Sequence, residues 1–338
     1  MVPAVHGARE PLTARRTLLV LLLLAGLLLL TSLIALSIGS VRISPGDVVG
    51  AIVASPAVDD ASRTIILDIR LPRLLLAMLV GAGLSIAGVV FQALLRNPLA
   101  EPYILGISSG GTVGAILAIG LSLGGVFTTP LASFAGSALV MLLVYSIAQR
   151  HGSLDTNTLL LAGVMIGAFF NAAVLLIIAV FNQELRNAFL WLMGNFSNAT
   201  MQSLAVVSPL VILASALLLV RAKHYNLIAT GDETALQLGV DVARLKQTSY
   251  LLASLITGLV VSVSGVIGFV GLIIPHLCRM VFGPDHRLLL PASLLLGATF
   301  MIIADLLART VLAPTEIPVG AVTAAIGAPL FIYLLKRT

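Results

Sequence analysis

Long runs of apolar residues recur along the chain and are separated by short polar segments rich in glycine, proline and charge. A helix needs about 20 mostly apolar residues to cross the hydrocarbon core of a bilayer. The pattern therefore predicts an all-α integral membrane protein, a compact bundle of ten transmembrane helices. The predicted crossings cover residues 17–38, 74–95, 103–122, 126–148, 157–181, 203–220, 247–264, 266–282, 288–307 and 319–335.

Two of these crossings need further argument. The pair that meets near Gly265 requires a very tight turn, Pro275 interrupts its second member, and an error of one crossing there would move the C-terminus to the other side. The first run, Thr17 to Ile38, follows Arg15 and Arg16 and also invites a secretory-signal interpretation. It exceeds the roughly 7 to 15 apolar residues of a signal core and lacks a clear cleavage site, so we predict a retained helix.

Composition agrees with a membrane protein. Hydrophobic residues make up 59% of the chain and charged residues 10%, with a mean hydropathy of +1.11. A water-soluble domain with this balance would aggregate. The sequence pI near 9.8 needs no nucleic-acid partner, because the basic residues fall where membrane topology requires them.

The distribution of Lys and Arg predicts the orientation. With an even number of crossings and the N-terminus inside, thirteen of the 19 basic residues lie on the inner side, as the positive-inside rule requires. Both termini are then cytoplasmic. The inner basic residues are Arg9, Arg15, Arg16, Arg96, Arg150, Arg221, Lys223, Arg244, Lys246, Arg279, Arg287, Lys336 and Arg337.

Small residues recur inside the crossings, as at Gly81, Ser85 and Gly88. In lipid, small side chains let helix backbones approach closely. This pattern favours helix packing over a direct role in binding a transported solute.

Two segments outside the crossings are long enough to fold locally. The outer segment, 39–73, contains Ser44 and Pro45, which suit the cap and first turn of a helix. The inner segment, 221–246, contains Thr230-Gly231-Asp232-Glu233, which matches a capping box.

A short helix should follow this capping box, end at Gly239 and lead to a further short piece capped by Asp241. The result would be a compact knob on the inner face, as opposed to a solvated loop.

The residues needed for catalysis are missing from the sequence. The three lysines are preceded by Ala222, Leu245 and Leu335, so no Gly-Lys-Ser/Thr loop can hold a nucleotide phosphate. The single cysteine, Cys278, excludes an intrachain disulfide. We find no catalytic triad, no paired-carboxylate site, no metal-binding cluster and no motif for a cofactor, and predict a protein that is not an enzyme.

Two ionisable residues lie inside apolar runs. Asp305 has Arg309 at i+4 and is expected to form a helix-surface pair near the outer end; a proton relay is the alternative. His276 follows Pro275, and we expect its ring to bond a backbone carbonyl freed by the proline, in preference to ligating iron or haem.

The prolines of Asn97-Pro98-Leu99-Ala100-Glu101-Pro102 predict a rigid inner turn. The segment Gly106-Ile107-Ser108-Ser109-Gly110-Gly111 then opens the third crossing, either as a half-broken helix that lines a cavity or as a kinked packing contact.

Taken together, these segments resemble the permease family that imports iron-siderophores, haem and cobalamin, often called FecCD-type, over nearly the whole chain. Gly110-Gly111 stands where Gly-Ala is more usual, a difference that affects packing more than function. The residues that carry the resemblance are Arg70-Leu71-Pro72-Arg73, Gly81-Ala82 through Gln92, 97–102, 105–110, 235–240, 268–276, Asp285-His286-Arg287, Ala304-Asp305 and 316–320.

The resemblance implies a ten-helix permease subunit of a homodimer in the inner membrane, a single domain over 1–338. A cytoplasmic ATP-binding subunit and a periplasmic or lipoprotein substrate-binding protein are its implied partners, with no nucleic acid. Coupling to the ATPase is then expected at the inner segment, docking of the binding protein at outward arginines, and a pathway between them. The coupling residues are Thr230, Gly231, Asp232, Glu233, Ala235, Leu238, Gly239 and Arg244; the docking residues are Arg70, Arg73 and Arg309; the pathway candidates are Gln92, Gly106, Ser108, Ser109 and His276.

Interfacial anchoring by snorkelling is the alternative role for Arg70 and Arg73. For the whole chain, the predicted function is import of a metal chelate, an iron-siderophore or haem, powered by the separate ATPase. Cobalamin is the alternative cargo. An ion-coupled secondary transporter and a membrane scaffold that moves no solute are the alternatives from other classes.

Overall fold

The computed structural model describes residues 13–150, 152–180 and 185–336, and among these the regular structure is helical except for one pair of two-residue strands. In chain order the elements are α1 (Ala14–Ser37), α2 (Pro45–Ile52), α3 (Asp60–Thr64), the π-helical turn η1 (Ile65–Arg70), α4 (Leu71–Leu94), the 3-10 turn η2 (Pro102–Leu105), α5 (Ile107–Gly120), α6 (Thr128–Ala148), β1 (Gln149–Arg150), β2 (Ser153–Leu154), α7 (Thr156–Val180), α8 (Leu185–Leu192), α9 (Met201–Val220), α10 (Ala222–Ala229), α11 (Asp232–Gln237), α12 (Val242–Ser264), α13 (Val270–Phe282), α14 (His286–Thr310) and α15 (Val319–Leu335).

Among the described residues, seven helices are long and apolar enough to cross a membrane: α1, the continuous helix Asp60–Leu94, α6, α7, α9, α12 and α14. Three shorter apolar helices, α5, α13 and α15, occupy the remaining predicted crossings. Each predicted crossing therefore coincides with an apolar helix. That all ten helices span the bilayer stays a prediction, since α13 contains only 13 residues, about 20 Å of helix.

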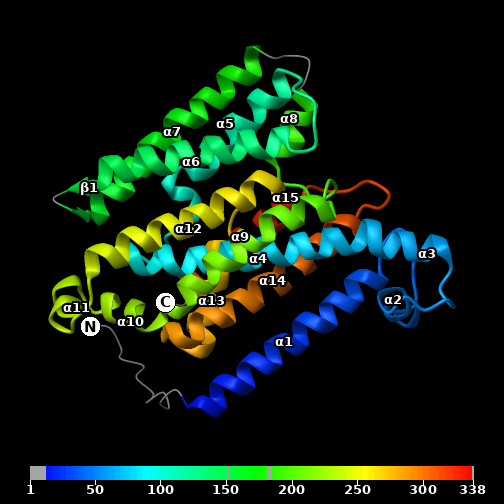
Figure 1. The fold of residues 1–338 in the computed structure, drawn as a ribbon, viewed down its shortest axis with the longest axis horizontal. Coiled ribbons are helices and arrows are strands. Elements are labelled where there is room, and N and C mark those ends of the chain that lie inside the picture. The colour runs from blue at the N-terminus through cyan, green and yellow to red at the C-terminus, as the bar shows by residue number, and fades with distance from the viewer. Residues whose placement is uncertain (1–12, 151, 181–184, 337–338) are drawn as a thin grey trace.

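The helices form a flattened bundle (Figure 1). Helices α5, α6, α7 and α8 lie together on one side, α4, α9, α12, α13 and α14 fill the middle, and α1 runs along the opposite side. Helix α1 packs mainly against α14 and exposes most of its length, while α4 is the most enclosed helix, with contacts to α9, α12, α13 and α14. The core therefore lies around α4.

Glycines let α4 approach its neighbours at backbone distance. A Cβ built on Gly81 would lie 2.1 Å from the carbonyl oxygen of Gly297 in α14, and one built on Gly88 would lie 1.9 Å from that of Gly271 in α13. No side chain fits at these separations. These small residues thus serve helix packing. In lipid, helices associate through van der Waals contacts, and small side chains allow the backbones to come close enough to make them.

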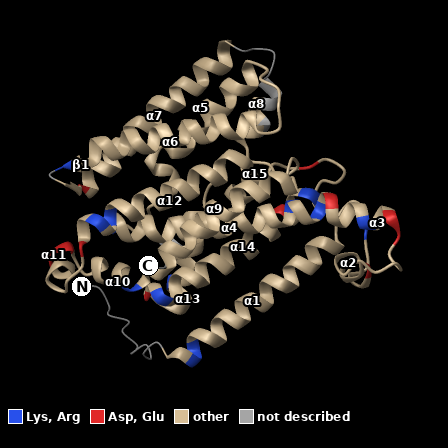
Figure 2. Cartoon of the chain, in the orientation of Figure 1, with Lys and Arg blue, Asp and Glu red and all other residues tan. Residues whose placement is uncertain are grey.

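Charged residues gather at the two ends of the bundle and leave its middle apolar (Figure 2). By the predicted orientation, the end that carries α10 and α11 is the inner end and the end that carries α2 and α3 is the outer end. The chain ends predicted to be cytoplasmic, 1–12 and 337–338, lie outside the described residues, as does 181 at the end of the fifth predicted crossing.

The outer segment folds partly as its sequence predicts. Ser44 caps α2, its hydroxyl accepts the amide of Asp47, and Pro45 occupies the first turn. The extent of the next helix was predicted wrongly, because residues 60–70 continue helically into α4. Arg70 and Arg73 therefore stand on a helix that projects beyond the predicted crossing.

Candidate coupling site and transport pathway

Two short helices at the inner end form the predicted knob, although their arrangement differs from the prediction. Helices α10 and α11 are joined at Gly231, whose φ of +133° suits glycine. The capping box predicted at Thr230 and Glu233 is absent: Thr230 ends α10, and its hydroxyl donates to the carbonyl of Leu227. Thr230 is the C-cap of α10, and Gly231 takes the N-cap position of α11.

The end of the knob follows the predicted chemistry. Gly239, at φ +82°, follows the last turn of α11. The carboxylate of Asp241 accepts the amide of Arg244, so Asp241 is the predicted cap. It begins the long helix α12 rather than the short piece that was predicted.

Asp232 fastens the knob to the bundle. Its Oδ2 lies 2.6 Å from Nζ of Lys246 in α12, and its Oδ1 pairs with the guanidinium of Arg96, just past the end of α4. The Lys246 side chain is 8% exposed, and its Nζ also lies 3.3 Å from Oγ1 of Thr156 at the start of α7. One carboxylate thus connects α11 with α12 and with the end of α4, and Lys246 extends the link to α7.

Several side chains of α11 and of the residue that follows it are exposed. Ala235 is buried against the bundle, whereas Leu236 and Leu238 are 57% and 61% exposed, and Glu233 is also exposed. Large apolar side chains exposed in a segment that ought to face the cytosol indicate a surface that another protein covers. Leu236 was not among the residues predicted from sequence.

Among the pathway candidates, Gln92 forms the most side-chain hydrogen bonds between described residues. Its amide nitrogen lies 3.4 Å from the carbonyl oxygens of Ala100 and Leu272, and its Oε1 accepts a hydrogen bond of 2.8 Å from Arg279. It joins α4, the inner turn and α13 to one another.

The start of α5 has the irregular backbone that its glycines and serines predict. Gly106, at φ +74°, separates η2 from α5, and a Cβ there would lie 2.9 Å from the backbone of Gly167 in α7. Ser108 and Ser109 are buried, and the Ser109 hydroxyl donates to the carbonyl of Gly106. This geometry is a close contact of α5 with α7, and a place in the pathway stays a prediction for these residues.

The contact predicted for His276 is wrong. Within the described part of the chain, both of its ring nitrogens are without a hydrogen-bond partner, and the ring lies edge-on to Phe331 with centroids 6.3 Å apart. The imidazole therefore bonds no carbonyl freed by Pro275.

Glu101 is a polar residue of the inner turn that the sequence analysis did not select. Its carboxylate accepts the amide of Phe269 at 2.6 Å, at the N-terminus of α13, and the hydroxyl of Tyr103 accepts the amide of Ile267 at 3.1 Å. The proline-rich turn and the irregular segment before α13 therefore satisfy each other's polar groups. The prolines and glycines make both segments visible in the sequence. The residues that bond between the two segments are 164 and 168 positions apart, so a local pattern could not show that they meet.

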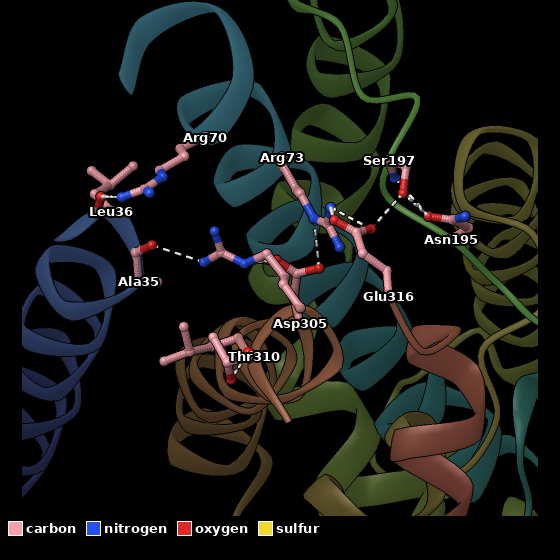
Figure 3. A network of polar contacts seen from close by, with 11 residues as sticks. Ala35, Leu36, Arg70, Arg73, Asn195, Ser197, Asp305, Thr310 and Glu316 are labelled. Carbon is pink, nitrogen blue, oxygen red and sulfur yellow. Dashed lines mark hydrogen bonds and ion pairs between the residues drawn. The ribbon is translucent and has the colours of Figure 1, made fainter. Parts of the chain in front are cut away.

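A network of charges, buried except at Glu316, occupies the outer end (Figure 3). The guanidinium of Arg73 lies 2.8 Å from Asp305 and 2.9 Å from Glu316, so it links α4 with α14 and with the segment before α15. Glu316 also accepts a hydrogen bond from Ser197. The predicted i+4 pair of Asp305 with Arg309 is present at 3.3 Å, although it is buried and not on the helix surface.

The three arginines predicted to dock a partner all have partners within the chain. Arg70 donates to the carbonyls of Leu36 and Val41, and Arg309 donates to that of Ala35. Together with Arg73 they bind the end of α1 to α4 and α14 (Figure 3). Among the described residues, no group of three or more His, Cys, Asp or Glu side chains could hold a metal ion.

The chain is similar in sequence to known transport proteins. The model of the FecCD transport family matches residues 27–337. The chain is 44% identical to the cobalamin import system permease protein BtuC of Halobacterium salinarum, over 82% of this chain and 75% of that protein. It is 41% identical to the hemin transport system permease protein HmuU of Yersinia pestis, over 91% and 94%.

A solved structure described as an inward-facing metal-chelate type ABC transporter superimposes with a TM-score of 0.85. It is 34% identical in sequence, and the match covers 94% of this chain and 99% of that one. The chain therefore belongs to the FecCD transport family of ABC permease subunits and is a multi-pass protein of the inner membrane.

Proposed function

We propose that this chain is the membrane subunit of an importer that moves a metal chelate, an iron-siderophore or haem, into the cell, driven by a separate ATP-binding subunit. The chain forms a single domain of ten crossings with both termini cytoplasmic and works as a homodimer. A periplasmic or lipid-anchored binding protein delivers the chelate at the outer end. Cobalamin is the alternative cargo, and relatives named for haem and for cobalamin import support either choice.

The observation that carries the proposal is the attachment of α11 through Asp232. A knob fixed by ion pairs to Lys246 in α12 and to Arg96 beyond α4 transmits a push from a partner to two central helices. A solvated loop would absorb the same displacement. The exposed Leu236 and Leu238 supply an apolar surface for the ATP-binding subunit.

The arrangement of acids argues against an ion-coupled transporter. Asp305 is the one acid set well inside an apolar run, and it lies between the guanidinium groups of Arg73 and Arg309. Each carboxylate oxygen is engaged by one guanidinium, so this acid serves to join α4 to α14 and is not left free to carry a proton.

For the outer end, we propose that the binding protein engages Arg70, Arg73 and Arg309 through the charge network. The Glu316 side chain is 43% exposed and is the accessible partner of Arg73. A carboxylate on the binding protein would compete with Glu316 for that guanidinium. Several such pairs must act together, because an exposed ion pair is worth at most about 1 kcal/mol.

For the pathway, we propose that Gln92, Gly106, Ser108, Ser109 and His276 line the route. Both ring nitrogens of His276 are without a hydrogen-bond partner among the described residues, which supports its place on the route. For coupling to the ATP-binding subunit, we propose Thr230, Gly231, Asp232, Glu233, Ala235, Leu238, Gly239 and Arg244.

Reconstitution tests the function. The chain, its cognate ATP-binding subunit and its binding protein are placed in liposomes, and uptake of haem, a ferric siderophore and cobalamin is followed in parallel with and without ATP. We expect ATP-dependent uptake of an iron chelate. Uptake of a solute by the chain alone under a proton or sodium gradient would instead establish a secondary transporter, and no uptake in either assay would favour a scaffold.

A further inference from the structure

Helix α2, at the outer end, exposes apolar side chains. Val49 and Ile52 in the helix and Val53 at its C-cap are 53%, 55% and 68% exposed. The side of the helix that faces the bundle carries Val48 and Ala51, which are buried. A helix between the core of a protein and water carries polar residues on its outward side. Helix α2 is apolar on both its buried and its exposed side, so its outward side is not suited to water.

The next helix in the outer segment, α3, has the opposite character. Its exposed residues are Asp60, Ala61 and Thr64, and its sequence contains no large apolar side chain. Acidic and basic residues are accordingly seen on α3 (Figure 2). One short segment therefore presents a polar surface at α3 and an apolar surface at α2, as expected if the two helices face different media.

The length of α1 sets the depth at which α2 begins. Helix α1 has 24 residues, about 36 Å of helix, and Arg15 and Arg16 lie in its first turn. The hydrocarbon core of a bilayer is about 30 Å thick. With the two arginines at the inner boundary of that core, Ser37 at the end of α1 reaches the outer boundary. The amide of Ile43 donates to the carbonyl of Ser37, so the chain folds back onto the end of α1 immediately before α2 starts.

The connection between α1 and α2 is held in place by Arg70. Its guanidinium donates to the carbonyl of Leu36 at the end of α1 and to that of Val41 in the connection. Helix α2 also contacts α1. In Figure 1, α2 is seen close to end-on, whereas α1 and α4 run across the view, so α2 crosses the spanning helices. It therefore lies along the membrane surface at the level where α1 leaves the hydrocarbon core.

The exposed apolar surface of α2 continues that of α1. Ile34 and Ile38 at the end of α1 and Val41 in the connection are exposed, and most of α1 is open to the bilayer. Arg42 is exposed beside Val41. An arginine at this depth can lay its stem along apolar surface and reach a headgroup with its guanidinium.

We propose that α2 is an interfacial helix embedded in the leaflet at the outer end. Val49, Ile52 and Val53 insert between the headgroups and the acyl chains of the phospholipids, and Arg42 meets a lipid phosphate. A helix that lies in the plane of the interface with its apolar side chains in the lipid has this arrangement. The role depends on the place of the chain in a membrane and not on the cargo that it carries.

Spin labels at single cysteines test which medium α2 faces. The native Cys278 is buried and is removed as Cys278→Ala. Val49→Cys or Ile52→Cys is then introduced, and the labelled full-length chain is placed in phosphatidylcholine liposomes. Power saturation measures access of oxygen, which concentrates among acyl chains, and of a water-soluble nickel complex, which the bilayer excludes. Leu29→Cys, at a residue of α1 that is 72% exposed, is the lipid reference, and Ala61→Cys on α3 is the water reference.

We expect the ratio of oxygen access to nickel access at Val49 and Ile52 to exceed the ratio at Ala61 several-fold and to approach the ratio at Leu29. Ratios equal to that at Ala61 would overturn the proposal, because α2 would then face water. Nickel access that is lost only when the binding protein is added would assign the surface to that partner and overturn it. Low access of both reagents, with spin-spin broadening between labels on two copies, would assign the surface to a second copy and overturn it as well.

A fluorescence measurement tests the same surface without cysteines. Val53→Trp is made in a Trp191→Phe background, and the liposomes contain phosphatidylcholine brominated near the headgroup end of its acyl chains. We expect strong quenching by the brominated lipid and weak quenching by acrylamide in the water. Ala61→Trp, in the same background, should show the reverse. Val53→Trp fluorescence that acrylamide quenches and brominated lipid does not would overturn the proposal.

Discussion

Oδ2 of Asp232 lies 2.6 Å from Nζ of Lys246, and this contact joins the first residue of the short helix α11 to the base of α12. The Lys246 ammonium is nearly buried, so it depends on that carboxylate for its charge balance. The knob and the bundle are consequently one mechanical unit at this point.

Replacing Asp232 with alanine should uncouple the knob. The buried Lys246 would lose its counter-charge at a cost of about 1–2 kcal/mol, less than for a fully buried pair because Asp232 is 38% exposed. We expect a lower melting temperature and reduced ATP-dependent uptake. The double variant Asp232→Ala with Lys246→Met removes both charges, so it should recover stability without recovering uptake. If it recovers both, the ion pair serves only stability.

The exposed face of α11 should bind the ATP-binding subunit. Leu236→Ser or Leu238→Ser removes an apolar side chain worth about 1–2 kcal/mol when buried, so affinity should fall about tenfold without loss of stability. Binding is measured by titrating the detergent-purified chain with the ATP-binding subunit. Leu123→Ser, at an exposed leucine of the outer end, is the matched control. Unchanged affinity in both α11 variants would place the interface elsewhere.

The features that could be predicted from the sequence are those that depend on residues close together in the chain. Apolar runs located the helices, Ser44 and Asp241 were identified as caps, and the i+4 spacing found the pair of Asp305 with Arg309. Each depends on residues within one or two helical turns of each other. Thr230 is the exception, because it is the C-cap of α10, and α11 begins one residue later than predicted, with Gly231 at its N-cap.

What could not be predicted depends on contacts distant in sequence. Arg73 meets Asp305 and Glu316 across 232 and 243 residues, so a local pattern shows three isolated charges where the fold forms one network. Helix α8 was also missed, since its eight residues are too few to appear as a crossing.

In the outer network, neutralising the buried Asp305 should lower the free energy of unfolding more than neutralising the exposed Glu316. Asp305 is 3% exposed, and Asp305→Asn leaves Arg309 without an opposite charge. We therefore expect the free energy of unfolding to fall by about 3 kcal/mol. Glu316→Gln should cost about 1 kcal/mol or less, because that side chain is 43% exposed and the amide still accepts a hydrogen bond. Denaturant midpoints of the two variants in one detergent give the order. A larger effect of Glu316→Gln would contradict the burial argument.

Backbone contact between α4 and α13 should make Gly88 intolerant of one added methyl group. The Cβ of Gly88→Ala would lie 1.9 Å from the carbonyl oxygen of Gly271, so the helices must separate, at a cost of about 1–3 kcal/mol or more. Gly26 in α1 has no atom within 4 Å of its built Cβ, and Gly26→Ala should stabilise its helix by up to about 1 kcal/mol. The two substitutions are chemically identical and should shift the unfolding midpoint in opposite directions. If both shift it upwards, α4 and α13 are farther apart in the bilayer than in the structure.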